Sequence, residues 1–208
     1  MKKSFISTKV ISEIAIFTAI AFALDFLQGG IFRGLFPNGG SIGIAMLPIL
    51  LLCYRRGFVV GLISSFCLSF LQMLGGVYAI ASDWYLVFLQ ICLDYVLAYP
   101  AVSVAGLFFK SFQNSDNKKT KIKYLVLGTT LGGLLKLLCH YLAGVIFWAS
   151  SCPDGFLGGP YVYSLVYNGG FMIPNIIINA LLLVLLFIKQ PSIFELEKKE
   201  EATNEKQA

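Results

Sequence analysis

Long apolar runs make up most of this chain, and they constrain its fold more than any other feature of the sequence. Hydrophobic residues account for 57% of the 208 residues and charged residues for only 13%. Soluble domains carry about 25% charged residues, so this chain lacks the charge needed to cover a globular surface. The runs do not alternate with a period of two, which favours membrane helices over a membrane β-barrel. The sequence therefore predicts an all-α integral membrane protein.

Six apolar segments have the length or composition expected of membrane helices. A helix needs roughly 20 residues to cross a hydrocarbon core of about 30 Å. The second segment is short and contains Pro48, so we expect a broken or steeply packed helix that other protein covers. The predicted six-helix bundle occupies residues 10–189, between an N-terminal segment, 1–9, and a polar tail, 190–208. Its predicted spans are residues 10–27, 42–54, 58–77, 84–109, 124–150 and 164–188.

Positive charge is confined to alternate connections between these segments. If the N-terminus is cytoplasmic, the outer connections hold only Arg33, Lys136 lies within a span, and every other Lys and Arg falls on the inner side. Cytoplasmic loops carry such an excess, so the pattern predicts a multi-pass protein of the cell membrane with both termini in the cytoplasm. The outer connections, residues 29–41, 78–83 and 151–163, are together rich in Gly, Pro and aromatic residues, as binding loops often are.

Ionisable residues inside the predicted spans are the strongest indication of function, because each costs about 2.5–3.5 kcal/mol at the centre of a bilayer. Glu13 and Asp25 lie near the ends of the first span, where we expect them to reach the interface. They also interrupt the pattern of a signal peptide, which favours a retained helix. Asp94, Lys136 and His140 lie deeper. A buried ion pair between Asp94 and Lys136 is an alternative to a ligand site, and the sequence leaves both open.

The fifth span carries a row of residues spaced by four. Lys136, His140, Gly144 and Trp148 therefore share one face of the predicted helix. Gly144 leaves a gap between an imidazole and an indole that a flat ligand ring could enter. Asp94 lies at a depth similar to that of His140, so we expect a carboxylate near this row.

The sixth span begins with polar and aromatic residues that include Tyr163 and Asn168. A primary amide inside a span needs partners for two donors and an acceptor. Together with the carboxylate, the imidazole and the nearby rings, these residues predict an outer pocket for a small, flat, cationic ligand that contains nitrogen. The carboxylate would balance the ligand's charge, the rings would stack on it, and the amide would bind its hydrogen-bonding edges.

A row of alanines follows one face of the first span. Ala15, Ala19 and Ala23 are spaced by four, and small residues at this spacing permit the close approach of another helix. The row predicts either a docking stripe for another membrane protein or packing inside the bundle, and the pattern alone does not separate the two.

Motifs of enzymes and of metal sites are absent from the sequence. It has one His, five Cys without a CxxC pair, and neither a GxSxG nor a phosphate-binding GKS or GKT motif. We therefore expect no catalytic activity, no metal and no cofactor. Any ATP-driven transport would need its ATPase from another chain.

Four segments, in chain order, carry a resemblance to a known family. They are LPILLLCYRRG (47–57), LDYVLAYP (93–100), LLKLLCHYLAGVIFW (134–148) and YSLVYNG (163–169). They resemble the thiamine-specific substrate-binding S component of energy-coupling-factor (ECF) transporters, of the ThiT type. The resemblance implies a six-helix S-component fold that binds thiamine at the outer face. It also implies a complex with a transmembrane T component and two cytosolic ATPases.

The resemblance further implies roles for individual residues. The alanine row would contact the T component. Some relatives have Glu at the position of Asp94 and Trp in the first outer loop, where this chain has Phe36. We therefore expect one wall of the pocket to be supplied by Phe36 or to lack an aromatic residue. The family's thiamine-binding residues fall on Tyr78, Asp94, Tyr95, His140, Gly144, Trp148, Tyr163 and Asn168.

Two functions of different classes follow from these observations. The first is capture of thiamine at the outer face and its delivery through the T component and the ATPases. The alternative is a self-sufficient secondary transporter of a small cationic solute, with Asp94, Lys136 and His140 as a relay. Binding of thiamine without ions or ATP would favour the first, and uptake driven by a proton gradient through this chain alone would favour the second.

Overall fold

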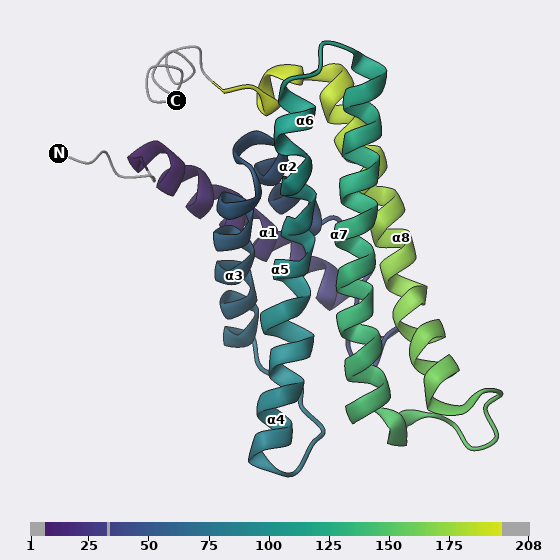
Figure 1. Ribbon diagram of the computed structural model, residues 1–208. Helices are drawn as coiled ribbons and strands as arrows, with labels where there is room; N and C mark the ends of the chain where they lie inside the picture. The colour runs from purple at the N-terminus through teal and green to yellow at the C-terminus, as the bar shows by residue number, and fades with distance from the viewer. Residues whose placement is uncertain (1–6, 33, 197–208) are drawn as a thin grey trace.

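The computed structural model of the chain is an elongated bundle of helices (Figure 1). It describes residues 7–32 and 34–196, and within these residues it contains no β-strand. Arg33 and most of the predicted terminal segments, 1–9 and 190–208, lie outside the described residues. The predicted all-helical class is confirmed for the part of the chain that is described.

Each of the six predicted segments corresponds to one helix or to one continuous helical rod. The fourth rod, Trp84–Gln113, is unusual because it changes its helical type along its length. The helices are α1 (Thr8–Phe32), α2 (Met46–Arg56), α3 (Phe58–Leu74), α4 (Trp84–Ile91), the π-helix η1 (Cys92–Leu97), α5 (Ala98–Val102), the 3₁₀ helix η2 (Ser103–Phe108), α6 (Phe109–Gln113), α7 (Lys118–Phe147), the 3₁₀ helix η3 (Ala149–Ser151), α8 (Gly159–Lys189) and the 3₁₀ helix η4 (Pro191–Phe194).

Four of the described rods are long and apolar enough to cross a membrane, namely α1, Trp84–Gln113, α7 and α8. The α3 helix has 17 residues and α2 only 11, and α2 is buried along most of its length. Of the two expectations for this segment, the break at Pro48 is wrong, because α2 is continuous from Met46 to Arg56. Pro48 lies in the first turn of α2, where its missing N–H would have no partner within the helix in any case.

The turn between α2 and α3 consists of a single residue, Gly57. Its φ of +87° lies in a region that L side chains rarely adopt. This turn directs Arg55 and Arg56 toward Glu13 of α1, whose carboxylate accepts hydrogen bonds of 3.2 Å from Arg55 Nε and 2.5 Å from Arg56 Nε. Glu13 therefore does not simply reach the interface, because it holds α1 to the α2–α3 turn.

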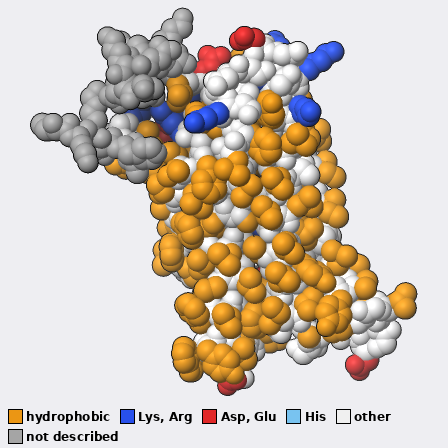
Figure 2. All heavy atoms as spheres, in the orientation of Figure 1, with side chains coloured by type: hydrophobic (Ala, Val, Ile, Leu, Met, Phe, Trp, Pro, Cys, Tyr) orange, Lys and Arg blue, Asp and Glu red, His pale blue; other side chains and the backbone are white. Residues whose placement is uncertain are grey.

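The surface of the bundle divides into an apolar middle and a charged end. Figure 2 shows hydrophobic side chains over the middle of this face, with Lys and Arg side chains gathered at the end where α6 meets α7. At that end η4 folds back onto the bundle, and Phe194 packs against Phe112 and Phe187. The pocket described below lies toward the opposite end of the helices.

Candidate functional site

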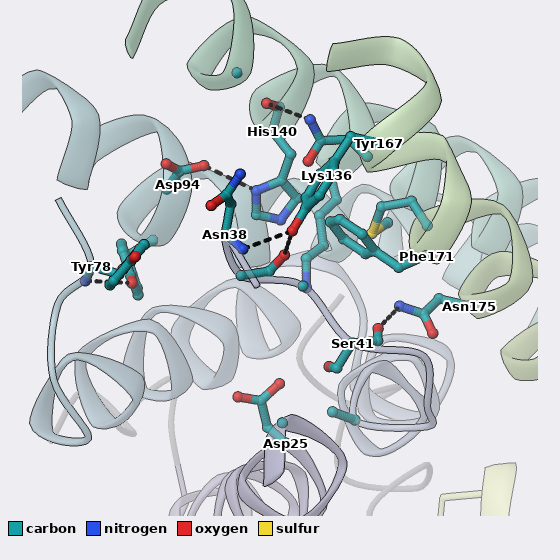
Figure 3. Close-up of a pocket in the computed structure, with 18 of the residues that line it drawn as sticks. Asp25, Asn38, Ser41, Tyr78, Asp94, Lys136, His140, Tyr167, Phe171 and Asn175 are labelled. Atoms are coloured by element: carbon teal, nitrogen blue, oxygen red, sulfur yellow. Dashed lines mark hydrogen bonds and ion pairs between the residues drawn. The ribbon is translucent and has the colours of Figure 1, made fainter. Parts of the chain in front are cut away.

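A cavity of about 250 Å³ lies between α1, η1, α7, α8 and the two connections that precede α2 and α4 (Figure 3). All of the residues predicted to bind a ligand line this one cavity, although they come from four separate parts of the sequence. Their role in binding stays a prediction, but their convergence on one site is a property of the fold. These residues are Tyr78, Asp94, Tyr95, His140, Gly144, Trp148, Tyr163 and Asn168.

The central polar contact of the cavity joins Asp94 to His140. His140 Nδ1 lies 3.1 Å from Asp94 Oδ1, and both side chains are mostly buried. An ionised carboxylate only accepts hydrogen bonds, so a hydrogen bond to it requires the proton on Nδ1, and in that neutral tautomer Nε2 is an acceptor. Asp94 stands on the π-helix η1, and such bulges are frequent at functional sites because they change the direction of the side chains that follow.

An aromatic pair closes one side of the cavity. The rings of Tyr78 and Trp148 are stacked, with centroids 5.3 Å apart and an interplanar angle of 13°. The backbone N–H of Tyr78 donates a 3.1 Å hydrogen bond to the hydroxyl of Tyr95, which ties the α3–α4 connection to η1. Three predicted residues from three elements thus form one wall.

Gly144 has a packing role that its spacing did not indicate. A Cβ atom at this position would collide with Ser164 and Asn168 of α8. Gly144 therefore allows α8 to lie close to α7, where Ser164 Oγ donates a 2.9 Å hydrogen bond to the carbonyl of Tyr141. Gly144 also lines the cavity, so its place beside a ligand ring stays a prediction.

The amide of Asn168 is only partly satisfied by the protein. Its Nδ2 donates to the carbonyl oxygens of His140, at 3.3 Å, and Ser164, at 3.0 Å. Its Oδ1 has no hydrogen-bond partner within the described part of the chain. Asn168 thus presents an acceptor at the cavity, while its donors orient the side chain.

The connection before α2 is bound to α8 by two side chains that are not among the predicted site residues, Tyr167 and Asn175. Tyr167 Oη accepts a 2.9 Å hydrogen bond from the N–H of Asn38 and donates one of 3.0 Å to the carbonyl of Gly39. Asn175 accepts from the N–H of Gly43 at 2.6 Å and donates to the carbonyl of Ser41 at 2.8 Å. The sequence could have indicated Asn175, because a primary amide inside an apolar span needs hydrogen-bond partners.

The connection between α1 and α2 contributes polar groups and backbone to the cavity, not an aromatic wall. Phe36 packs edge-on against Tyr167 and Phe171, at centroid distances of 5.9 and 5.4 Å, and it is not among the residues that line the cavity. The loop residues that do line it are Asn38, Gly39, Gly40, Ser41 and Gly43. Of the two expectations for this wall, the structure therefore supports the one without an aromatic residue.

Asp25 belongs to the cavity, although its position near the end of a span had favoured a place at the interface. Its side chain lines the cavity and accepts hydrogen bonds from Tyr99 Oη at 2.9 Å and Gln72 Nε2 at 2.6 Å. An ionisable side chain inside a predicted span could have indicated a functional role for Asp25. Its position near the end of the span instead favoured a side chain that reaches the interface. Nothing in the sequence indicated Gln72 or Tyr99 as its partners.

Lys136 does not form the ion pair with Asp94 that the sequence left open. Its ammonium group lies 3.2 Å from the centroid of the Tyr99 ring, and within the described residues Asp94 is paired with His140 instead. A relay through Asp94, Lys136 and His140 is therefore not continuous. In the described residues no group of three or more His, Cys, Asp or Glu side chains could hold a metal ion.

Comparison with known proteins identifies the family. The fold matches the solved structure of ThiT from Listeria monocytogenes, with a TM-score of 0.72 and 24% identity, over 90% of this chain and 97% of that chain. The chain is 35% identical over 190 residues to the thiamine transporter ThiT of Bacillus subtilis (strain 168), covering 89% of this chain and 94% of that protein. It is 30% identical over 188 residues to the thiamine transporter ThiT of Lacticaseibacillus paracasei, covering 89% and 90%. The model of the thiamine transporter protein family (Thia_YuaJ) matches residues 11–195, and the chain belongs to this family.

Proposed function

We propose that this chain binds thiamine in the cavity and is the substrate-binding S component of an ATP-driven ECF importer. The contact between Asp94 and His140 carries the proposal, because it sets a carboxylate and an imidazole acceptor beside stacked rings in one enclosed site. Thiamine combines a permanently cationic thiazolium ring with an aminopyrimidine that has donor and acceptor edges. Each of these features has a matching group in the cavity.

Charge is the first of these matches. The Asp94 carboxylate balances the thiazolium or accepts from the amino group, and hydrogen bonds to charged groups contribute about 1.5–3 kcal/mol. Asn168 Oδ1 supplies a second acceptor for the amino group. His140 Nε2 supplies a third when Asp94 holds the proton on Nδ1.

Aromatic faces are the second match. A flat cation gains about 0.5–2 kcal/mol from the face of an indole or a phenol, with the larger values in desolvated sites. Trp148 and Tyr78 offer such faces, and Tyr163 lines the same cavity. The cavity volume of about 250 Å³ is near the lower end of the range for small-molecule sites, which fits a vitamin better than a larger solute.

Partner subunits are needed because the sequence has no ATP-binding motif. Ala15, Ala19 and Ala23 are all exposed on α1, so packing inside the bundle does not account for the row. We assign this face to the transmembrane T component, which would couple the chain to two cytosolic ATPases. Close approach of small residues is a common basis for helix association in membranes.

We place the protein in the plasma membrane, and in the proposed orientation both of its termini lie in the cytoplasm. The charge pattern supports this, because Arg55, Arg56 and the lysines at the start of α7 lie at one end of the bundle. The cavity would then open toward the outside, where thiamine is captured.

Fluorescence titration of the purified chain tests the proposal. Trp148 lines the cavity and Trp84 is 82% exposed, so Trp84→Phe leaves the reporter in the site. We expect saturable quenching by submicromolar thiamine without ions or ATP. No change in Trp148 fluorescence, together with no heat of binding by calorimetry, would overturn the proposal. Proton-driven uptake by vesicles that contain only this chain would instead support secondary transport.

A further inference from the structure

A second cavity, of about 330 Å³, lies between α1, α2, α8 and η4, and we call it the side groove. Pro48 and Leu51 form its buried floor, whereas Ile20 of α1 is 46% exposed and forms its rim. The groove shares no lining residue with the cavity described above. All of its lining residues are apolar, namely Phe17, Ile20, Leu24, Leu47, Pro48, Leu51, Leu186 and Ile193.

Charged side chains close one end of the side groove. Arg55 lies one helical turn beyond Leu51 on α2, and its guanidinium contacts both walls of the groove. Its Nη1 donates a 2.8 Å hydrogen bond to the carbonyl of Ile193, and its Nη2 lies 3.2 Å from Glu13 Oε1. Glu13 precedes Phe17 by four residues and so shares its face of α1. The groove therefore passes from a wholly apolar region to fixed charges, which is the order of chemistry along a phospholipid.

The charge at this end of the groove is positive on balance. Glu13 is paired with two guanidinium groups, so one positive charge of the three groups is left over. Lys189 follows Leu186 by three residues, which puts its exposed side chain on the groove side of α8, nearer to the charged end. Within the described residues the Lys189 ammonium has no ion-pair partner. The described charged residues at this end of α1, α2, α8 and η4 are Lys9, Glu13, Arg55, Arg56, Lys189 and Glu195.

The size of the side groove fits one acyl chain. Phe17 and Leu24 are seven residues apart, so the groove extends about 10 Å along α1. One leaflet of the hydrocarbon core is about 15 Å deep, which is half of the whole core. A helix is about 10–12 Å across, and a 10 Å length of helix would need roughly twice the volume of the groove. A chain of methylene groups therefore fits the groove better than a helix of a partner protein does.

We propose that the side groove binds one acyl chain of an anionic phospholipid from the leaflet at its charged end, with the phosphate beside Lys189 and Arg55. Lipid tails are as apolar as Leu side chains, so the groove alone does not distinguish one lipid from another. The preference for an anionic lipid comes from the positive end, because basic groups at a membrane surface attract anionic headgroups. The bound chain fills the space between α1 and α8 and so supports the helix that carries the alanine row. The inference does not depend on which ligand the cavity described above binds.

Native mass spectrometry of the purified full-length protein tests the acyl-chain site, with phosphatidylglycerol and phosphatidylcholine of identical acyl chains as the probes. We expect the wild-type protein to bind phosphatidylglycerol at least fivefold more tightly. Ile20→Trp places an indole in the groove from its exposed rim and should weaken binding of both lipids at least fivefold. Ile16→Trp is the matched control, because Ile16 is 57% exposed on the same helix outside the groove, and it should bind both lipids like the wild-type protein.

A second variant tests the headgroup without changing the apolar groove. Lys189→Gln removes an exposed charge and should lower the preference for phosphatidylglycerol to twofold or less, while binding of phosphatidylcholine stays the same. Lys110→Gln removes the same charge from an exposed position of α6, which contributes no residue to the groove, and should keep the preference. Equal binding of the two lipids by the wild-type protein would overturn the proposal, and so would an unchanged preference in Lys189→Gln.

The Tm and the helical content by circular dichroism establish that each variant is folded. If Ile20→Trp unfolds the bundle, Leu24→Trp tests the same groove from its other end, with the same expected loss of both lipids. Lipid binding that is unchanged by an indole in the groove would overturn the proposal. A wild-type protein that binds neither lipid, with an Ile20→Trp variant that no longer copurifies with the T component, would assign the groove to that partner instead.

Discussion

His140 Nδ1 lies 3.1 Å from Asp94 Oδ1, and this contact joins the π-helix η1 to the C-terminal half of α7. The two residues are 46 positions apart in the sequence and belong to helices that the bundle brings together. Their contact fixes the direction of both side chains before a ligand arrives. Fixed polar groups reduce the entropy cost of binding, which favours high affinity for a small ligand.

Loss of the Asp94 charge should weaken thiamine binding strongly. Asp94→Asn removes the charged acceptor while keeping the shape, and we expect a loss of about 1.5–3 kcal/mol, or tenfold or more in affinity. Calorimetry with purified protein measures this. Asp154→Asn removes a charge from an exposed loop residue and should leave the affinity unchanged. Equal affinity of the wild-type and Asp94→Asn proteins would remove Asp94 from the binding site.

A methyl group at Gly144 should push α7 and α8 apart. Gly144→Ala directs its Cβ at Ser164 and Asn168, and overpacking of this kind costs about 1–3 kcal/mol. We expect a lower Tm in detergent and weaker thiamine binding. Gly169→Ala is a suitable control on α8, because its Cβ would meet only Ile173 at 3.6 Å. If both variants melt like the wild-type protein, the helix contact is looser than the structure indicates.

Release of the connection before α2 should reduce affinity without unfolding the bundle. Asn175→Ala removes two hydrogen bonds that join the loop to α8, and each contributes about 0.5–1.5 kcal/mol. We expect faster hydrogen exchange in residues 34–45 and weaker thiamine binding. Asn114→Ala, at an exposed amide near the charged end of the bundle, should change neither quantity. Unchanged exchange in Asn175→Ala would contradict the role of this side chain.

The Glu13 ion pairs should matter for stability but not for the ligand. Glu13→Gln leaves Arg55 and Arg56 without their carboxylate, at a cost of about 1–3 kcal/mol for groups that are 8–14% exposed. We expect the Tm to fall while the dissociation constant for thiamine stays within twofold. A large loss of affinity at an unchanged Tm would show that this end of α1 communicates with the cavity.

Bulk on the alanine face of α1 should prevent assembly. Ala19→Trp should leave thiamine binding intact and abolish copurification with the T component, because two helices could no longer approach closely. Leu185→Trp places the same ring on an exposed position of α8 and should assemble normally. If Ala19→Trp also loses thiamine binding, the alanine row is required for the fold of this chain.

The sequence predicted the six helical segments well because their signal is local: an apolar run of sufficient length has few alternatives in a membrane. It also predicted that Asp94 and His140 lie at similar depth. It did not predict the role of Asp25, since a carboxylate near the end of a span can reach water, and only the tertiary fold brings Tyr99 and Gln72 to it. The π-helix η1 could not be predicted from the sequence either, because it depends on how the rod Trp84–Gln113 packs against the other helices.

The alanine row and Asp25 belong to the same helix, α1. This single helix of 25 residues, about 37 Å long, carries the exposed alanines along its middle and Asp25 two residues beyond the last of them. A helix moves as a stiff rod, so a partner that tilts its first half must also displace the carboxylate at the cavity. Docking of a partner on α1 would then move Asp25 directly, so docking and release of the ligand would be coupled through this one helix.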